Sequence, residues 1–224
     1  MPVGQEQDIS PLTNWTNPLT ITLTADLTVT PRFAQRLRFT DVSPSTTGAT
    51  EAIAQLAVRG IIRGYADGRF GPNDSTLRAQ MAALIVRAMG WGGESADNPF
   101  ADRQGVDDEL WQAIAILAAH DVVRGYGDGR YGTTDAVLNV QVISFVTRAM
   151  VARGYWTQQA DDPQLYPNVT DPTHRRDLAT YVHYAGVVRG TTAVTDPFTG
   201  WDQPASRAWF AFVLWQALDS RFGR

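Results

Sequence analysis

Residues 60–72 read Gly-Ile-Ile-Arg-Gly-Tyr-Ala-Asp-Gly-Arg-Phe-Gly-Pro, and this run decides the fold because it recurs. Residues 124–132, Arg-Gly-Tyr-Gly-Asp-Gly-Arg-Tyr-Gly, repeat its central part almost letter for letter. A looser copy begins at residues 186–190 with Gly-Val-Val-Arg-Gly. Internal repeats at such a spacing are typical of supersecondary units that bury their apolar faces against one another. We therefore expect three repeats of one structural unit.

Each repeat is expected to hold two helices joined by the glycine-rich run. In the first repeat, apolar residues recur at helical spacing up to Gly60, which is expected to end the helix in a left-handed conformation. The pair Asp67-Gly68 indicates a tight turn, with Tyr65 and Phe70 as strand-like flanks. Residues 73–76, Asn-Asp-Ser-Thr, offer side chains that could cap the second helix.

The repeats are separated by stretches rich in turn-forming residues. By this criterion the first repeat covers residues 37–92, the second 98–155 and the third 163–220. The short segments between them are linkers by composition. Three repeats and an N-terminal segment of different character therefore make up the chain.

The N-terminal residues 1–36 differ from the rest. Between Leu19 and Val29 apolar residues alternate with threonine, which predicts a β-hairpin that turns at Ala25-Asp26. Pro31 would stop the strand pairing. The segment resembles the closing strands of bacterial extracellular B-repeat-type β modules. We expect either the end of such a module or an edge that pairs with another chain.

Composition excludes several classes of protein. The chain of 224 residues is 44% hydrophobic, which supports a core, and it has no apolar run near the roughly 20 residues of a membrane span. Its net charge of −4 argues against non-specific binding to nucleic acid, and the absence of cysteine excludes disulfides and thiolate metal sites. The three histidines lack metal-ligand spacing, and acidic residues fall in expected helix starts and linkers. We expect no cofactor, no metal and no catalytic activity.

The beginning of the chain bears on its location. Met-Pro-Val-Gly-Gln-Glu at residues 1–6 is not followed by an apolar h-region, so no signal peptide is expected. The protein is then either cytoplasmic or a piece of a longer secreted protein.

Residues 37–220 resemble the S-layer homology repeats of bacterial cell-surface proteins. The resemblance is carried by Phe39-x-Asp41-Val42, by the run at residues 60–72 and by Arg78-Ala-Gln80, together with their counterparts in the second repeat. It implies a mainly α fold in which three helical hairpins pack as a pseudo-threefold bundle. It also implies an extracellular module at the cell surface that binds pyruvylated secondary cell-wall polysaccharide in grooves between the repeats.

The family signature at the start of the second helix is Ile-Thr-Arg-Ala-Glu, and its arginine faces the ligand. The corresponding residues here are Thr-Leu-Arg-Ala-Gln at 76–80, Val-Leu-Asn-Val-Gln at 137–141 and Ala-Ser-Arg-Ala-Trp at 205–209. The resemblance therefore points to Arg78 and Arg207 as ligand contacts, with Asn139 at the equivalent position of the second repeat.

Arg78 and Arg207 have two interpretations. A positive side chain at a helix start opposes the helix dipole, so it is a poor choice for helix stability alone. One interpretation is a bidentate clamp on a ligand carboxylate, aided by free N–H groups at the helix end. The other is a structural salt bridge to a neighbouring repeat.

Five further residues are candidates for the binding site: Asp41, Asp102, Trp111, Trp201 and Trp209. The two aspartates could cap the helices that follow them or accept hydrogen bonds from sugars. The three tryptophans fall near expected groove mouths, where an indole face can stack on a sugar ring, or else they belong to the core.

Two functions of different classes follow from these observations. The first is a non-catalytic anchor that binds cell-wall polysaccharide. The second is a structural subunit of a surface layer or extracellular filament, which would self-assemble through its N-terminal strands by adding them to a neighbour's sheet.

Overall fold

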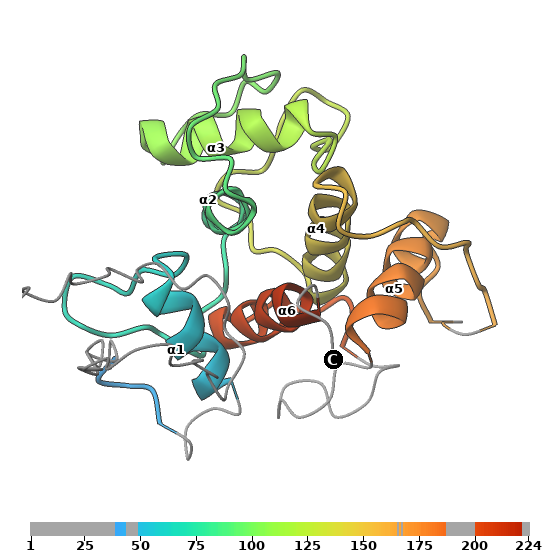
Figure 1. The fold of residues 1–224 in the computed structure, drawn as a ribbon. Coiled ribbons are helices and arrows are strands. Elements are labelled where there is room, and N and C mark those ends of the chain that lie inside the picture. The colour runs from blue at the N-terminus through green and yellow to red at the C-terminus, as the bar shows by residue number, and fades with distance from the viewer. Residues whose placement is uncertain (1–38, 44–48, 165, 167, 187–199, 221–224) are drawn as a thin grey trace, which may run out of the picture. The chain divides into compact units, whose positions relative to one another are not determined.

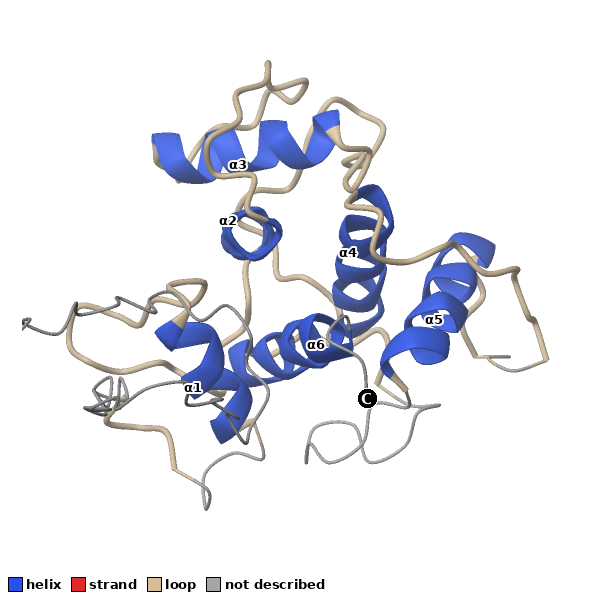
Figure 2. Ribbon diagram, in the orientation of Figure 1, coloured by secondary structure: helices blue, strands red, loops and turns tan. Residues whose placement is uncertain are grey.

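The computed structural model describes residues 39–43, 49–164, 166, 168–186 and 200–220, all within the unit Gln35–Arg224. The β-hairpin and the assembly edge predicted for residues 1–36 lie outside these ranges. The described part is mainly helical, as the sequence predicts (Figure 2). Its helices are α1 (Thr50–Val58), α2 (Arg78–Met89), α3 (Asp108–Ala119), α4 (Asn139–Ala152), α5 (Pro172–Ala185) and α6 (Arg207–Ser220).

The first helix ends in the way that the sequence predicts. Gly60 has a φ of 68°. The N–H groups of Gly60 and Ile61 donate to the carbonyls of Ala57 and Leu56, at 2.9 and 3.0 Å. This pair of bonds is a Schellman motif, which satisfies two of the carbonyls that a helix end leaves free.

The predicted turn forms, but its flanks are not strands. The Asp67 carboxylate accepts hydrogen bonds from the Arg69 backbone N–H at 3.0 Å and from Arg69 Nε at 2.7 Å. Within the described ranges the pairing of extended backbone is limited to isolated bridges. Phe70 turns inward instead, is 2% exposed, and lies 5.4 Å from the ring of Phe39. The end of the turn therefore belongs to the core.

The main helix contacts join neighbouring repeats (Figure 1). The second helix of each predicted repeat packs against the first helix of another, so α2 packs on α3, α4 on α5 and α6 on α1. Further contacts join α6 to α4 and α5, and α2 to α4. The apolar faces seen in the sequence are thus buried largely between repeats, and less within the helical hairpins that the sequence suggested.

The three segments that precede α2, α4 and α6 also pair with one another. Each makes an isolated antiparallel bridge to both of the others, through Ser75 and Ser206, Leu77 and Ala136, and Leu138 and Pro204. Main chain from all three predicted repeats therefore meets at one place. The pseudo-threefold symmetry of the bundle stays a prediction.

The starts of these three helices are capped by main chain from another repeat. A helix leaves its first N–H groups without intrahelical partners. In α2, α4 and α6 the first two of these groups donate to carbonyls of a neighbouring loop. The acceptors are Asp135 and Thr133 for α2, Gln203 and Trp201 for α4, and Asp74 and Pro72 for α6, at 2.8 to 3.3 Å.

The side-chain caps predicted from residues 73–76 are therefore wrong. The residue before α2 is Leu77, which makes no side-chain cap, and Gln80 reaches back to the Leu77 N–H at 3.4 Å. Thr76 is used in another way. Its N–H donates to the Ala205 carbonyl at 2.8 Å, and its carbonyl accepts from the Val137 N–H at 2.9 Å. Contacts between repeats replace the local cap.

Removing residues 163–224 should abolish cooperative folding. The truncation takes away α6, which packs on α1 and α4, and it also removes the carbonyls that cap α4. Thermal unfolding followed by far-ultraviolet circular dichroism should then lose its sharp transition. A truncated chain that melts cooperatively near the temperature of the full chain would contradict this coupling.

Candidate binding site at the helix starts

The first residue of α2, α4 and α6 contacts a loop of another repeat in each case. Arg78 Nε donates to the Tyr131 carbonyl at 2.8 Å. Arg207 Nε donates to the Phe70 carbonyl at 2.7 Å. Asn139 Nδ2 donates to the Gly200 carbonyl at 2.8 Å. The three residues that the sequence places in register thus occupy equivalent positions in the structure.

Both arginines lie over aromatic rings. The guanidinium carbon of Arg78 is 4.9 Å from the ring centre of Tyr126 and 4.7 Å from that of Tyr131. That of Arg207 is 4.9 Å from Tyr65 and 4.7 Å from Phe70. Such distances are typical of cation–π interactions. We call these two groups of residues the Arg78 contact and the Arg207 contact.

The two arginines are not held by salt bridges to the described carboxylates. In the part of the chain that the structure describes, Arg78 donates through Nε alone, and Arg207 adds only a bond from Nη2 to the Arg63 carbonyl at 3.3 Å. Arg78 is nevertheless 2% exposed. Burial lowers the pKa of Arg207, although Tyr65, Asp74 and Asp41 act in the opposite direction. These are cations that neighbouring carbonyls and rings position without neutralising them.

One feature expected of a ligand clamp is missing from both contacts. The free N–H groups at the helix starts were expected to help hold a ligand. The first two of each helix are occupied by carbonyls of the neighbouring loop instead. A ligand at the Arg207 contact would meet the arginine side chain and its aromatic neighbours. At the Arg78 contact, where the arginine is 2% exposed, it would meet chiefly Tyr126.

Asp41 and Asp102 hold the loops that supply these carbonyls. The Asp41 carboxylate accepts from the N–H groups of Phe70 and Gly71, at 2.8 Å each. The Asp102 carboxylate accepts from those of Tyr131 and Gly132, at 2.7 Å each, and from Thr133 at 3.3 Å. The idea that they cap the following helices is therefore wrong. In the case of α3 the cap is Asp107, which accepts from the Leu110 N–H at 2.8 Å.

These bonds alter the acidity of both aspartates. Burial alone would raise the pKa of Asp41 and of Asp102, because it disfavours the charged form. The backbone N–H donors outweigh burial and hold both pKa values below the ordinary value. Both carboxylates are consequently charged at neutral pH.

Gly132 is required beside Asp102. Its φ is 82°, and a Cβ there would fall 2.6 Å from Asp135 Oδ2 and from the Tyr126 ring. The loop passes so close to these side chains that no larger residue fits without a shift. Gly71 stands in the same relation to Asp74 and Tyr65.

Tyrosine–aspartate pairs are the part of the site that the sequence analysis missed. The Tyr65 hydroxyl donates to Asp74 Oδ2 at 2.9 Å, and the Tyr126 hydroxyl donates to Asp135 Oδ2 at 2.8 Å. Burial and the bonded carboxylate raise the pKa of both tyrosines. Tyr65 and Tyr126 are 38% and 47% exposed, so each offers aromatic surface beside an arginine. Their equal spacing in the two copies was the available signal.

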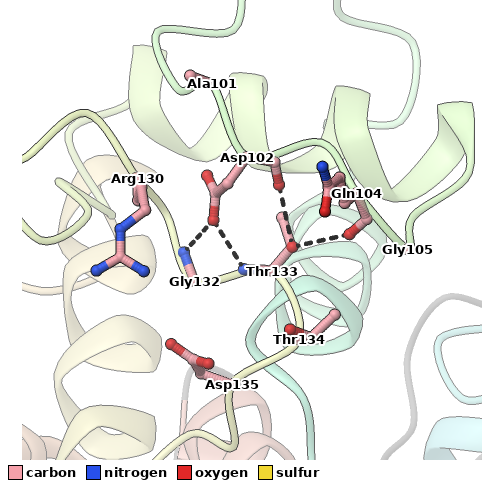
Figure 3. Close-up of a pocket in the computed structure, with 9 residues that line it drawn as sticks. All are labelled: Ala101, Asp102, Gln104, Gly105, Arg130, Gly132, Thr133, Thr134 and Asp135. Carbon is pink, nitrogen blue, oxygen red and sulfur yellow. Dashed lines mark hydrogen bonds between the residues drawn. The ribbon is translucent and has the colours of Figure 1, made fainter.

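A pocket of about 490 Å³ opens beside the loop that caps α2 (Figure 3). Thr133 and Asp135, whose carbonyls cap α2, line it together with Asp102 and Arg130. The Thr133 hydroxyl donates to the carbonyls of Asp102 and Gln104, at 3.1 and 3.2 Å. Figure 3 shows the Asp102 carboxylate directed toward the loop.

The three candidate tryptophans are not gathered at these contacts. Trp201 is 8% exposed and Trp209 is 1% exposed, so both rings lie in the core rather than at a surface where a sugar could stack. Trp111 is partly buried, with the Arg103 guanidinium 6.0 Å from its ring centre. Among the aromatic residues beside the two arginines, Tyr65 and Tyr126 are the exposed ones.

Two other kinds of site were sought within the described residues. No group of three or more His, Cys, Asp or Glu side chains there could hold a metal ion. No helix among them is long and apolar enough to cross a membrane.

Comparison with known proteins gives a family for the first two repeats. Residues 38–82 and 99–137 match the family described as S-layer homology domain. These two segments are similar to the S-layer homology domain. The matches cover the Arg78 contact, the Asp41 and Asp102 loops and the paired tyrosines.

Similar proteins come from several bacteria, and some of them are named for the cell wall or cell surface. The Middle cell wall protein of Brevibacillus brevis is 25% identical over 164 residues, which are 66% of this chain and 15% of that protein. The Cell surface protein of Thermoanaerobacter kivui is 29% identical over 122 residues, 53% of this chain and 16% of that protein. Endo-1,4-beta-xylanase A of Thermoanaerobacterium saccharolyticum is 35% identical over 82 residues, 37% of this chain and 7% of that protein.

The chain thus spans no more than 16% of the length of these three relatives. The S-layer homology domain and the names of the relatives point to an extracellular location at the cell surface.

Acid should destabilise the protein through Asp41 and Asp102. The pKa values of both aspartates are lower in the folded than in the unfolded protein. Their contribution to the free energy of unfolding is therefore complete above the unfolded-state pKa of about 3.9, and it is lost as the pH falls through their folded-state pKa values. The double variant D41N/D102N should melt below the parent at pH 6, and the gap should narrow toward pH 3. Calorimetry at a series of pH values measures the difference in melting temperature between the variant and the parent. A difference that does not change with pH would rule out the stabilising role of the two carboxylates.

Proposed function

We propose that the chain anchors a larger protein to the cell wall by binding wall polysaccharide at the Arg78 and Arg207 contacts. The observation that carries the proposal is that the two guanidinium groups are held in place without a carboxylate partner among the described residues. Each is fixed by one or two carbonyls and by stacking on aromatic rings, yet neither has a carboxylate partner among the described residues. An acidic substituent on a polymer would supply that partner.

The chemistry of the two contacts suits an anionic sugar. Arginine binds carboxylates bidentately. Among the described residues, both terminal amino groups of Arg78 and one of those of Arg207 make no hydrogen bond. The exposed faces of Tyr65 and Tyr126 could stack on a sugar ring next to the charge. A pyruvyl group is one substituent that would fit this description.

The third repeat is included in the proposal on structural grounds. Residues 163–220 supply α5 and α6, which pack on α4 and α1 as α3 packs on α2. The start of α6 is capped by the first repeat, and Arg207 makes its contact with the loop of that repeat. The boundaries 37–92, 98–155 and 163–220 remain the proposed limits of the repeats.

Asn139 makes the equivalent position of the second repeat a poor anion site. Its side chain carries no charge, and its amide is already bonded to the Gly200 carbonyl. We therefore infer that two of the three equivalent positions bind the polymer.

Replacing either arginine should weaken wall binding. A charge-assisted hydrogen bond contributes about 1.5–3 kcal/mol, so R78A and R207A should each lower the affinity roughly tenfold or more. Lysine should rescue binding only in part, because an ammonium lacks the planar fork. Binding is measured by sedimentation with purified cell-wall sacculi, before and after their secondary polymer is removed, below the melting temperature of every variant.

The N139A variant provides the matched control. Both R78A and N139A remove a bond to the neighbouring loop, so both should lower the melting temperature. Only the arginine variants should lose wall binding. If all three variants bind as the parent does and merely melt earlier, the arginines are structural and the proposed site is wrong.

A further inference from the structure

Two helix pairs in the structure are equivalent but differ in the chemistry of their buried residues. We call the packing of α2 on α3 the first junction and the packing of α4 on α5 the second junction. Each joins the second helix of one repeat to the first helix of the next. The repeated run places α4 in register with α2, and the caps Asp107 and Asp171 place α5 in register with α3. The two junctions can therefore be compared residue by residue.

Five positions that are apolar at the first junction are polar at the second. Four of the polar side chains are 0% exposed, and the fifth, an imidazole, is partly buried. The pairs, with the residue of the first junction named first, are Ala83 and Ser144, Val86 and Thr147, Ala113 and Asp177, Ile116 and Thr180, and Leu110 and His174.

The polar side chains of the second junction bond across the two helices. Ser144 Oγ lies 2.6 Å from His174 Nδ1. The Thr147 hydroxyl donates to the Asp177 carbonyl at 3.2 Å, and Arg148 Nε donates to the Asp177 carboxylate at 2.8 Å. Hydrogen bonds and one ion pair thus hold this junction at positions where the first junction has apolar contacts.

The polar network of the second junction is not complete. Asp177 Oδ1 is buried, and no described group donates a hydrogen bond to it. An unpaired buried polar atom lowers stability, because it has lost its contact with water and gained no partner. We therefore expect the second junction to open more readily than the first when a charge on it changes.

His174 is the group through which acid can change that charge. Burial lowers the pKa of His174 and Arg148 acts in the same direction, whereas Asp171 and Asp177 oppose them. No described residue of α6, which also packs on α5, adds to the shift. His174 stands in the first turn of α5, where a positive charge also opposes the helix dipole. The packed junction therefore favours the neutral imidazole.

We propose that the second junction is an acid-sensitive joint, which loosens α5 from α4 when His174 is protonated while the first junction stays packed. The folded-state pKa of His174 lies below the unfolded-state value of about 6.5. Its contribution to stability is therefore complete above that value and is lost as the pH falls toward the folded-state pKa. This loss begins at higher pH than that of Asp41 and Asp102, so the two responses to acid can be separated.

Hydrogen–deuterium exchange of the full chain at pH 7 and pH 5 tests the proposal. After correction for the intrinsic effect of pH on exchange, the amides of α5 should exchange several-fold faster at pH 5. Those of α3 should exchange at the same corrected rate at both pH values. An equal acceleration in α3 and α5 would show a general effect of acid and would overturn the proposal.

The decisive variant is S144A/H174L, which installs at the second junction the residues that the first has at Ala83 and Leu110. Its α5 amides should exchange at the same corrected rate at pH 7 and pH 5. H174Q keeps the test valid if the double variant fails to fold, because a glutamine amide can bond to Ser144 but is not protonated in this range. It should also remove the response to acid.

The matched control is H183Q. His183 lies in the last turn of the same helix and is exposed, so its protonation places no charge between α4 and α5. H183Q should keep the acid response of the parent, and loss of the response in H183Q would contradict the role of His174. If S144A/H174L and H174Q respond to acid as the parent does, the joint does not depend on His174 and the proposal is wrong.

Discussion

The structure depends on how the starts of α2, α4 and α6 are capped. Leaving a buried N–H group unpaired costs on the order of 1–3 kcal/mol, and a helix start presents several such groups. Here two from each helix are satisfied by carbonyls of another repeat. The repeats cannot separate without leaving these N–H groups unpaired. The main-chain hydrogen bonds therefore couple the folding of each repeat to that of its neighbour.

These caps place a demand on the loops, because the loop carbonyls must point at the neighbouring helix. Asp102 fixes one loop by gathering the N–H groups of Tyr131, Gly132 and Thr133. The Thr133 carbonyl then accepts from the Ala79 N–H of α2. One aspartate in the second repeat therefore helps to hold a helix of the first.

The sequence predicts the parts of the fold that are local. Apolar spacing, the left-handed Gly60 and the Asp67 turn each involve neighbouring residues, and each is present. The caps could not be predicted, because the carbonyls that cap α2 belong to Asp135 and Thr133 in another repeat. The helix-start residues were found through the family signature, whereas the burial of Trp201 and Trp209 depends on tertiary packing. The pairing of Tyr126 with Asp135 was partly predictable. The spacing of the two residues recurs in the first repeat, but the sequence does not show that their side chains meet.

The helix caps that join the repeats are main-chain hydrogen bonds. Side chains at the same positions can therefore differ between repeats while these hydrogen bonds are kept. Arg78, Asn139 and Arg207 begin helices whose caps are alike, yet two carry a charge and one does not. The junctions between helices behave similarly, since Glu109 pairs with both Arg63 and Arg87 at one, whereas Arg124 and Arg148 pair with Asp121 and Asp177 at the other. A shared backbone frame with divergent polar side chains gives each repeat its own chemistry, so binding in this protein has to be assigned repeat by repeat.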